Sequence, residues 1–320
     1  MFHFLSARFS IGCLSLLFIS PLLGEQVLDV GNTFTCYFQD TDDTKYNYTS
    51  TSTWTFEQID AVTRALSTWD NLILNTPARK LSVGLYWIDQ GYSALASASS
   101  PGIYYLTSGL QKCSTVAEKV WREGDASAGY DNSFDIKIYC NSNQINWFYY
   151  GADTMAVDEW KYDFQTIITH EIGHALGFIT YSKSDGTFQT YNVDSSSTTT
   201  IYSAFDSLMT NAGKEQIISK ANGGNQAFTV GETLALSDTG LTVYNPSAWS
   251  NGSSMCHIDT DSDPDALMRY IFGYNETQRT LTAAEVRLMS AMGWKTIPES
   301  SASTLSLLGF FFLLWRRKRH

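Results

Sequence analysis

Residues 169–180, THEIGHALGFIT, hold two histidines and a glutamate, His170, Glu171 and His174, in the order H-E-x-x-H. Residues four apart on an α-helix lie on one face, so the two imidazoles can bind a single metal ion. Glu171, one position further round, can reach a water bound to that ion. A catalytic zinc site takes three protein ligands, and Thr180, six residues after His174, cannot supply a nitrogen donor. The stretch therefore predicts a helix that carries two-thirds of a metal site.

The scarcity of histidine indicates where the third ligand lies. The chain has five histidines. Two belong to the motif, and His3 and His320 lie close to the two ends. His257 is the one that remains, in the segment SSMCHID that precedes ALMRY. We therefore expect His257 to complete the metal site, and two carboxylates between the motif and this segment, Glu215 and Glu232, are the alternative donors.

Three segments, HEIGHALGF (170–178), SSMCHID (253–259) and ALMRY (266–270), together resemble the metzincin zinc peptidases. The likeness is to the leishmanolysin-like members, in which an insertion separates H-E-x-x-H-x-x-G from the third histidine. It implies an α+β catalytic domain over 25–297 in two lobes that divide near residue 178. The N-terminal lobe would hold a twisted mixed sheet with two helices, and the C-terminal lobe would be irregular with a terminal helix. The insertion is long here, so the architecture of the second lobe stays open.

The resemblance also implies the roles of the site residues. Glu171 would be the general base that activates a zinc-bound water, and Met268 would be the methionine of a turn beneath the metal. Tyr270 would stabilise a developing oxyanion, as a tyrosine two positions after the turn methionine does in the astacin branch. Ordinary packing is the alternative for both Met268 and Tyr270. The Zn²⁺ ligands that the resemblance implies are His170, His174 and His257.

These residues predict the hydrolysis of peptide bonds in a peptide or protein substrate. Zinc on three neutral imidazoles keeps its double charge and an open position, where it lowers the pKa of water to about 7 and polarises a carbonyl. Glu171 would pass the proton of that water to the leaving amine, while an edge strand holds the substrate extended. One alternative is a gluzincin-type peptidase with Glu215 or Glu232 as third ligand. The other is a non-catalytic exported surface or adhesion protein that retains the peptidase fold.

Both ends of the chain have the composition of targeting signals. Residues 1–24 place Arg8 before an apolar run and a small residue, as a secretory signal peptide does. Residues 298–320 combine Pro298-Glu299, an apolar run too short for a comfortable membrane span, and a basic cluster. This order resembles the PEP-CTERM sorting signal of exported bacterial proteins, apart from Ser300, where that signal usually has a second proline. We expect an exported protein, secreted or at the cell surface, whose tail meets a sorting protease or tethers it to a membrane.

The composition excludes some classes of protein. Hydrophobic residues make up 43% of the chain and charged residues 17%, which is typical of a globular protein. The formal net charge is −11, and no basic stripe interrupts the body of the chain, so a nucleic-acid partner is not expected.

The cysteines and an acidic run leave two further questions. Four cysteines follow the leader, Cys36, Cys113, Cys140 and Cys256, and they could form two disulfides or stay as buried free thiols. The alternating aspartates of residues 259–265 suggest a calcium loop. An EF-hand loop would need glycine and glutamate where this chain has Pro264 and Tyr270, so we expect a solvated turn.

Local signals predict the elements around the motif. Capping boxes begin one helix at Thr55 and another at Thr282, and the latter ends at Gly293. The helix that carries the motif should start after Asp163 as N-cap and end at Gly177. Between residues 180 and 256 no period is clear, and strands are predicted at 33–39, 80–89, 102–108 and 134–141.

Overall fold

A computed structural model describes the chain apart from its two ends and a few short segments. Within the described residues, no helix is both long and apolar enough to cross a membrane. The leader at 1–24 and the tail at 298–320 lie outside them, so both assignments stay predictions. The described residues are 26–41, 50–91, 94–104, 107–129, 133–149 and 159–297.

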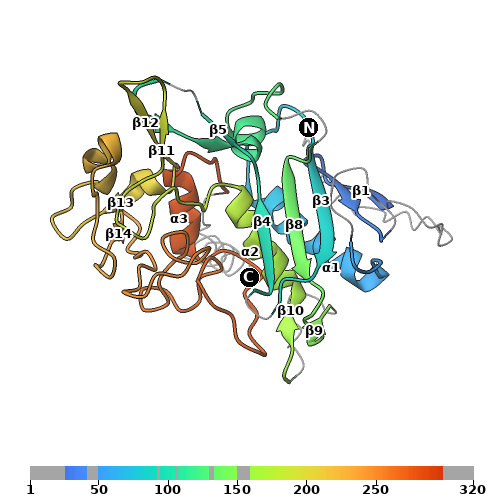
Figure 1. Ribbon diagram of the computed structural model, residues 1–320. Helices are drawn as coiled ribbons and strands as arrows, with labels where there is room; N and C mark the ends of the chain where they lie inside the picture. The colour runs from blue at the N-terminus through green and yellow to red at the C-terminus, as the bar shows by residue number, and fades with distance from the viewer. Residues whose placement is uncertain are drawn as a thin grey trace, which may run out of the picture.

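A five-stranded mixed sheet lies on one side of the fold (Figure 1). Its strand order is β1-β2-β3-β8-β4, with the three central strands parallel and both edge strands antiparallel to their neighbours. Three of the predicted strands are confirmed as β2, β3 and β8. The other two, at the edges, are additions to the prediction. The bounds are β1 (Gln26–Val30), β2 (Phe34–Phe38), β3 (Leu81–Ile88), β4 (Ala96–Ser99) and β8 (Ile136–Asn141).

The strand predicted over 102–108 is wrong at residues 104, 107 and 108, and residues 105–106 lie outside the described residues. Of the described residues in this range, Gly102–Ile103 forms a strand, β5, which pairs with β7 (Ser114–Thr115). Tyr104 leaves the strand and stacks its ring on Tyr191, with centroids 5.2 Å apart. Two adjacent tyrosines give this segment the composition of a strand, but one of them packs against strand β11 (Thr190–Asn192), from beyond the motif.

Two helices pack in the same half of the molecule as the sheet, as expected (Figure 1). Helix α1 (Phe56–Leu72) begins with both hydrogen bonds of the predicted capping box at Thr55. Helix α2 (Phe164–Ala175) carries the motif, and the Asp163 side chain caps it by accepting from Thr166 N. Gly177 follows with φ +112°, a conformation that side chains other than glycine's rarely adopt, so the chain can turn sharply out of α2.

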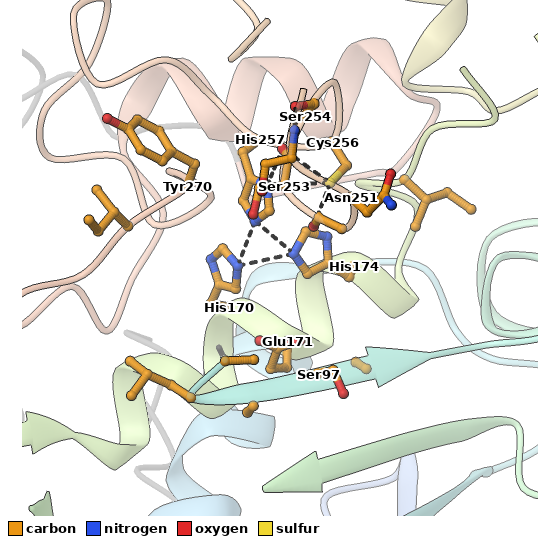
Figure 2. A pocket seen from close by; sticks show the side chains of 18 of the residues that line it. Ser97, His170, Glu171, His174, Asn251, Ser253, Ser254, Cys256, His257 and Tyr270 are labelled. Atoms are coloured by element: carbon orange, nitrogen blue, oxygen red, sulfur yellow. Dashed lines mark hydrogen bonds between the residues drawn. The ribbon is translucent and has the colours of Figure 1, made fainter. Parts of the chain in front are cut away.

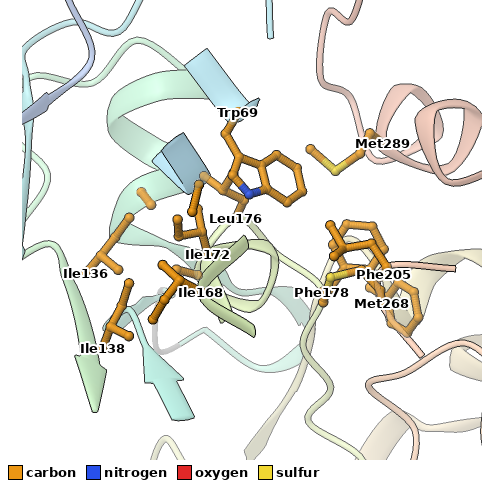
Figure 3. Close-up of a cluster of buried hydrophobic side chains, with 14 of the residues drawn as sticks. Trp69, Ile136, Ile138, Ile168, Ile172, Leu176, Phe178, Phe205, Met268 and Met289 are labelled. Carbon is orange, nitrogen blue, oxygen red and sulfur yellow. The ribbon is translucent and has the colours of Figure 1, made fainter. Parts of the chain in front are cut away.

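Apolar packing fixes the rotation of α2 about its axis (Figure 3). Ile168 and Ile172 of α2 and the β8 residues Ile136 and Ile138 are all buried in this core. On the α1 side, the indole Nε1 of Trp69 donates to Thr169 O at 2.9 Å. Because these contacts occupy one face of α2, the face with the two motif histidines is left for the site.

Short elements make up the rest of the fold. Strand β12 pairs in parallel with β6, so the segment after α2 returns to residues that precede it. The predicted terminal helix is confirmed as α3 (Ala283–Ala291), with its capping box at Thr282. A π-helical turn, Glu118–Arg122, was not foreseen. The remaining strands are β6 (Gly109–Lys112), β9 (Trp147–Phe148), β10 (Tyr162–Asp163), β11 (Thr190–Asn192), β12 (Thr198–Tyr202), β13 (Met209–Thr210) and β14 (Ala235–Leu236), with 3-10 turns at Asp206–Leu208, Ile217–Lys220 and Asn222–Gly224.

A buried ion pair joins the start of α2 to the chain that leads into α3. The guanidinium of Arg279 donates to both carboxylate oxygens of Asp163, at 2.8 and 2.7 Å. Gln278 N donates to the hydroxyl of Thr166, one turn into α2. Both ionic side chains are almost fully buried, so losing one partner would leave an uncompensated charge in the core. The segment after the predicted methionine turn is therefore anchored directly to the motif helix.

Candidate metal centre

The three histidines expected to bind a metal lie together (Figure 2). The Nε2 atoms of His170 and His174 are 3.0 Å apart, and each lies 3.1 Å from Nε2 of His257. Three nitrogens at bonds of 2.0–2.1 Å to a tetrahedral ion would be about 3.3 Å apart, so this triangle is close to one face of such a site. Among the described residues it is the only group of histidine, cysteine and carboxylate side chains close enough to hold an ion.

Backbone carbonyls fix the tautomer of all three imidazoles. Nδ1 of His170 donates to Leu267 O at 2.8 Å, Nδ1 of His174 to Phe178 O at 2.6 Å, and Nδ1 of His257 to Ser253 O at 2.8 Å. A carbonyl only accepts, so each Nδ1 carries the proton and each Nε2 presents its lone pair. Three lone pairs that converge within 3.1 Å repel one another unless a cation lies between them. The donor set therefore fits a metal ion.

Burial keeps these imidazoles neutral, which metal binding requires. It lowers the pKa of all three histidines below the ordinary value of 6.5, and that of His257 falls to about 3. The neighbouring histidines lower the pKa of His170 and His257 further. Protons therefore compete weakly for the Nε2 atoms near neutral pH.

Glu171 lies beside the histidine cluster, above the edge strand β4 (Figure 2). It lines the same cavity as the imidazoles and is 7% exposed. Burial raises the pKa of its carboxyl group to about 8, although a hydrogen bond from the backbone of Ala98 opposes this. A cation on the imidazoles would favour the carboxylate again. With a cation bound, Glu171 would therefore be a carboxylate in the same cavity as the three imidazoles.

Met268 packs directly against the motif helix. It is fully buried. A Cβ built at Gly173, between Glu171 and His174 in the motif, would lie 2.4 Å from Met268 Sδ. The sulfur therefore occupies the space that any side chain at 173 would need. The neighbouring residue, Leu267, supplies the carbonyl to His170, so the turn around Met268 supports the first histidine.

Tyr270 lines the cavity but does not face the imidazoles. Its ring stacks on Tyr244, with centroids 3.6 Å apart and an interplanar angle of 6°. Figure 2 shows the phenol pointing away from the three histidines. The oxyanion role given to Tyr270 by resemblance stays a prediction, and it requires the ring to leave this stack.

The other sequence candidates lie away from the cluster. Glu215 pairs with Lys220, and Glu232 accepts from Thr229 N at 3.0 Å, so neither joins the histidines. In the acidic run, Asp259 and Asp263 accept from backbone N–H groups two residues on. They belong to no metal-binding group within the described residues. Of the two states left open for the cysteines, the structure has buried free thiols at Cys36, Cys113, Cys140 and Cys256.

The cluster opens into a cavity of about 1130 Å³. Edge strand β4 contributes one wall, and residues 249–254, 256–257 and 269–272 line the cavity as well. Sequence reasoning missed the three carbonyls that orient the imidazoles and the contact of Glu171 with Ala98. Backbone groups leave no trace in residue identity, so no sequence signal could have revealed them.

Comparisons of the chain with models of protein families, with curated proteins and with solved structures find no match. The mixed α+β fold and the histidine cluster are therefore described from the sequence and structure of this chain, without support from a related protein.

Proposed function

We propose that this protein is an exported zinc-dependent endopeptidase of the metzincin type. One observation carries the proposal: three neutral imidazoles converge through Nε2, with a buried carboxylate beside them, in a cavity that an edge strand borders. A site that only bound a metal would have no need of Glu171 at this position. The metzincin assignment rests on the motif segments and on the contact between Met268 and Gly173.

Zinc is the metal that this donor set favours. Three histidine nitrogens with an open fourth position are typical of catalytic zinc, and no carboxylate of the described residues joins them, as Mg²⁺ or Ca²⁺ would prefer. When bound, the zinc would supply an activated water and polarise the substrate carbonyl. The protein's own part is to hold the imidazoles neutral and to keep Glu171 within reach of that water.

Glu171 would act as the general base and then as the acid. Its carboxylate would take the proton of the attacking water and deliver it to the leaving amine, so no covalent link to the enzyme is needed. Its burial beside β4 excludes bulk water from this transfer. Burial raises the pKa of this carboxyl group to about 8 and a bound cation would lower it, so the two opposing effects suit a group that first accepts and then releases the proton.

The cavity suits an extended polypeptide substrate. Strand β4 is the last strand of its sheet, and its residues Ala96–Ala98 border the cavity, together with Leu95 just before the strand. An extended peptide could add to this edge by backbone hydrogen bonds, which give affinity for any sequence. Side-chain preference would then depend on the opposite wall.

A digestion assay tests the proposed function. Purified protein is incubated with casein or gelatin, with and without a chelator, and then with zinc restored. We expect hydrolysis that the chelator abolishes and zinc restores, and that Glu171→Gln abolishes while Glu232→Gln does not. If folded, zinc-loaded protein cleaves nothing, or if Glu171→Gln cleaves at the wild-type rate, the proposal fails and the non-catalytic alternative is favoured.

A further inference from the structure

One peptide group links the first histidine to a carboxylate outside the site. The carbonyl of Leu267 accepts from Nδ1 of His170 at 2.8 Å. The N–H of the same peptide group, on Met268, donates to Oε1 of Glu285 at 2.7 Å. The two bonds lie at opposite ends of one planar amide, so His170 and Glu285 are connected through a single rigid group.

Glu285 does more than its place in a capping box explains. As the third residue of α3, it accepts from Thr282 N at 2.8 Å, which is the ordinary capping bond. It also accepts from Leu267 N at 3.0 Å and from Met268 N, and it is fully buried. Burial raises the pKa of Glu285 to about 7, and the three N–H donors act against that shift. A capping residue needs only the first bond and no burial.

We propose that Glu285 is a positioning residue of the metal centre, which acts on His170 through the Leu267–Met268 peptide. The carboxylate fixes this peptide group in place. By accepting its N–H it also polarises the group, which makes the Leu267 carbonyl a stronger hydrogen-bond acceptor. A stronger acceptor at Nδ1 holds the ring in one orientation and raises the basicity of Nε2. This is the carboxylate–histidine–metal arrangement with an amide inserted between the first two members. The inference rests on the proposed metal site.

The other two histidines provide a comparison within the molecule. His174 and His257 also donate to backbone carbonyls, those of Phe178 and Ser253. Within the described part of the chain, no carboxylate contact is found at the N–H of either of those peptide groups. A change at Glu285 should therefore affect His170 and leave the other two imidazoles nearly unchanged.

Three substitutions separate positioning from capping. Glu285→Gln keeps the shape of the side chain but removes its charge. Both carboxylate oxygens of Glu285 accept hydrogen bonds from backbone N–H groups, so the NH₂ group of the glutamine must face at least one of these donors. Glu285→Asp keeps the charge on a shorter arm. Thr282→Ala removes the helix cap that accepts from Glu285 N and leaves the Glu285 carboxylate in place. It is the matched control, because the Thr282 hydroxyl makes only the weakest of the contacts with the Glu285 carboxylate, and the bonds from Leu267 N and Met268 N stay.

The experiment is NMR of protein with ¹⁵N-labelled histidine at pH 8, where Glu285 is ionised, together with zinc affinity by chelator competition. In Glu285→Gln we expect the Nδ1–H proton of His170 to move to lower frequency, while those of His174 and His257 stay. Zinc affinity should fall about tenfold, the lower end of the 10–100-fold range for groups behind a metal ligand. Thr282→Ala should melt at a lower temperature than wild type, but its His170 signal and its zinc affinity should equal those of wild type.

The proposal is overturned if Glu285→Gln leaves the His170 signal in place, or if Thr282→Ala moves it equally. Should Glu285→Gln not fold, Glu285→Asp decides: an unmoved His170 signal in that folded variant also overturns the proposal. If wild-type protein binds no zinc, the proposed function fails. The proton signals of the metal-free protein still report on the link.

Discussion

The contact between Gly173 and Met268 makes an unusual prediction about a helix glycine. Alanine stabilises a helix interior by about 1 kcal/mol relative to glycine, so Gly173→Ala should stabilise α2 if nothing else changed. The added Cβ would instead lie 2.4 Å from Met268 Sδ, 2.9 Å from Cε and 3.3 Å from Cζ2 of Trp69. Overfilling a packed core costs about 1–3 kcal/mol. We therefore expect Gly173→Ala to lower the free energy of unfolding by about 1 kcal/mol.

The same variant should weaken the metal site. To make room, the Met268 side chain must shift, and the adjacent Leu267 carbonyl, which holds His170, would move with it. Met268→Ala alone leaves a cavity and should cost about 2–5 kcal/mol. In the double variant the alanine Cβ at 173 fills part of that cavity. The double variant should then be more stable, by at least about 1 kcal/mol in the free energy of unfolding, than the sum of the two single effects predicts.

Urea denaturation of the four proteins, with chelator and with zinc, measures this cycle. The difference between the two conditions reports zinc binding, because a ligand of the folded state adds its binding free energy to stability. Two results would refute the reasoning. In the first, Gly173→Ala is more stable than wild type by the full gain in helix propensity and binds zinc with unchanged affinity. In the second, the effects of the two substitutions on the free energy of unfolding simply add in the double variant. Either would mean that Met268 does not support α2 at this point.

Three further predictions follow from the site and the termini. Glu171→Gln should abolish hydrolysis while elemental analysis still finds zinc, because Glu171 is a base and not a ligand; loss of zinc would show that the role is wrong. Burial lowers the folded-state pKa of His257 to about 3 from 6.5, so its contribution to stability is present above about pH 6.5 and is lost as the pH falls. Denaturation of the metal-free proteins between pH 7 and 5 should therefore show that the free energy of unfolding of wild type, relative to that of His257→Gln, falls by about 1.4 kcal/mol for each pH unit below 6.5. If the free energies of unfolding of the two proteins change with pH in parallel, the burial of a neutral imidazole is contradicted. Mass spectrometry of protein from its native host should find a start near Glu25 and loss of the basic cluster, whereas an intact chain in the cytoplasm would exclude export.

Sequence reasoning was reliable where one residue type has one local consequence. Thr55 and Thr282 mark helix starts because their hydroxyls accept the free N–H groups of the first turn. His257 could be selected by counting, because the body of the chain offers no other histidine beyond the motif.

The features that the sequence did not reveal depend on contacts between distant segments. The edge strand β4, ASAS, has no apolar alternation to mark it, since only Ala96 of its four residues is buried. Tyr104 lies in a segment with the composition of a strand, but its ring stacks on Tyr191. The ring of Tyr270, whose oxyanion role stays a prediction, stacks on Tyr244. Glu285 was identified as a helix cap, and nothing in its position along the chain could reveal that it also holds the peptide behind His170.

The central claim is that His170, His174 and His257 together hold one zinc ion, and the zinc content of folded His257→Ala tests it most directly. The measurement is elemental analysis of dialysed protein, with circular dichroism to show that the variant is folded and Glu232→Ala as the matched control. We predict about one zinc per chain in wild type and in Glu232→Ala, and almost none in His257→Ala, because two histidines alone bind zinc weakly. A folded His257→Ala protein that retains one zinc per chain, or a folded wild type that binds none, would contradict the claim.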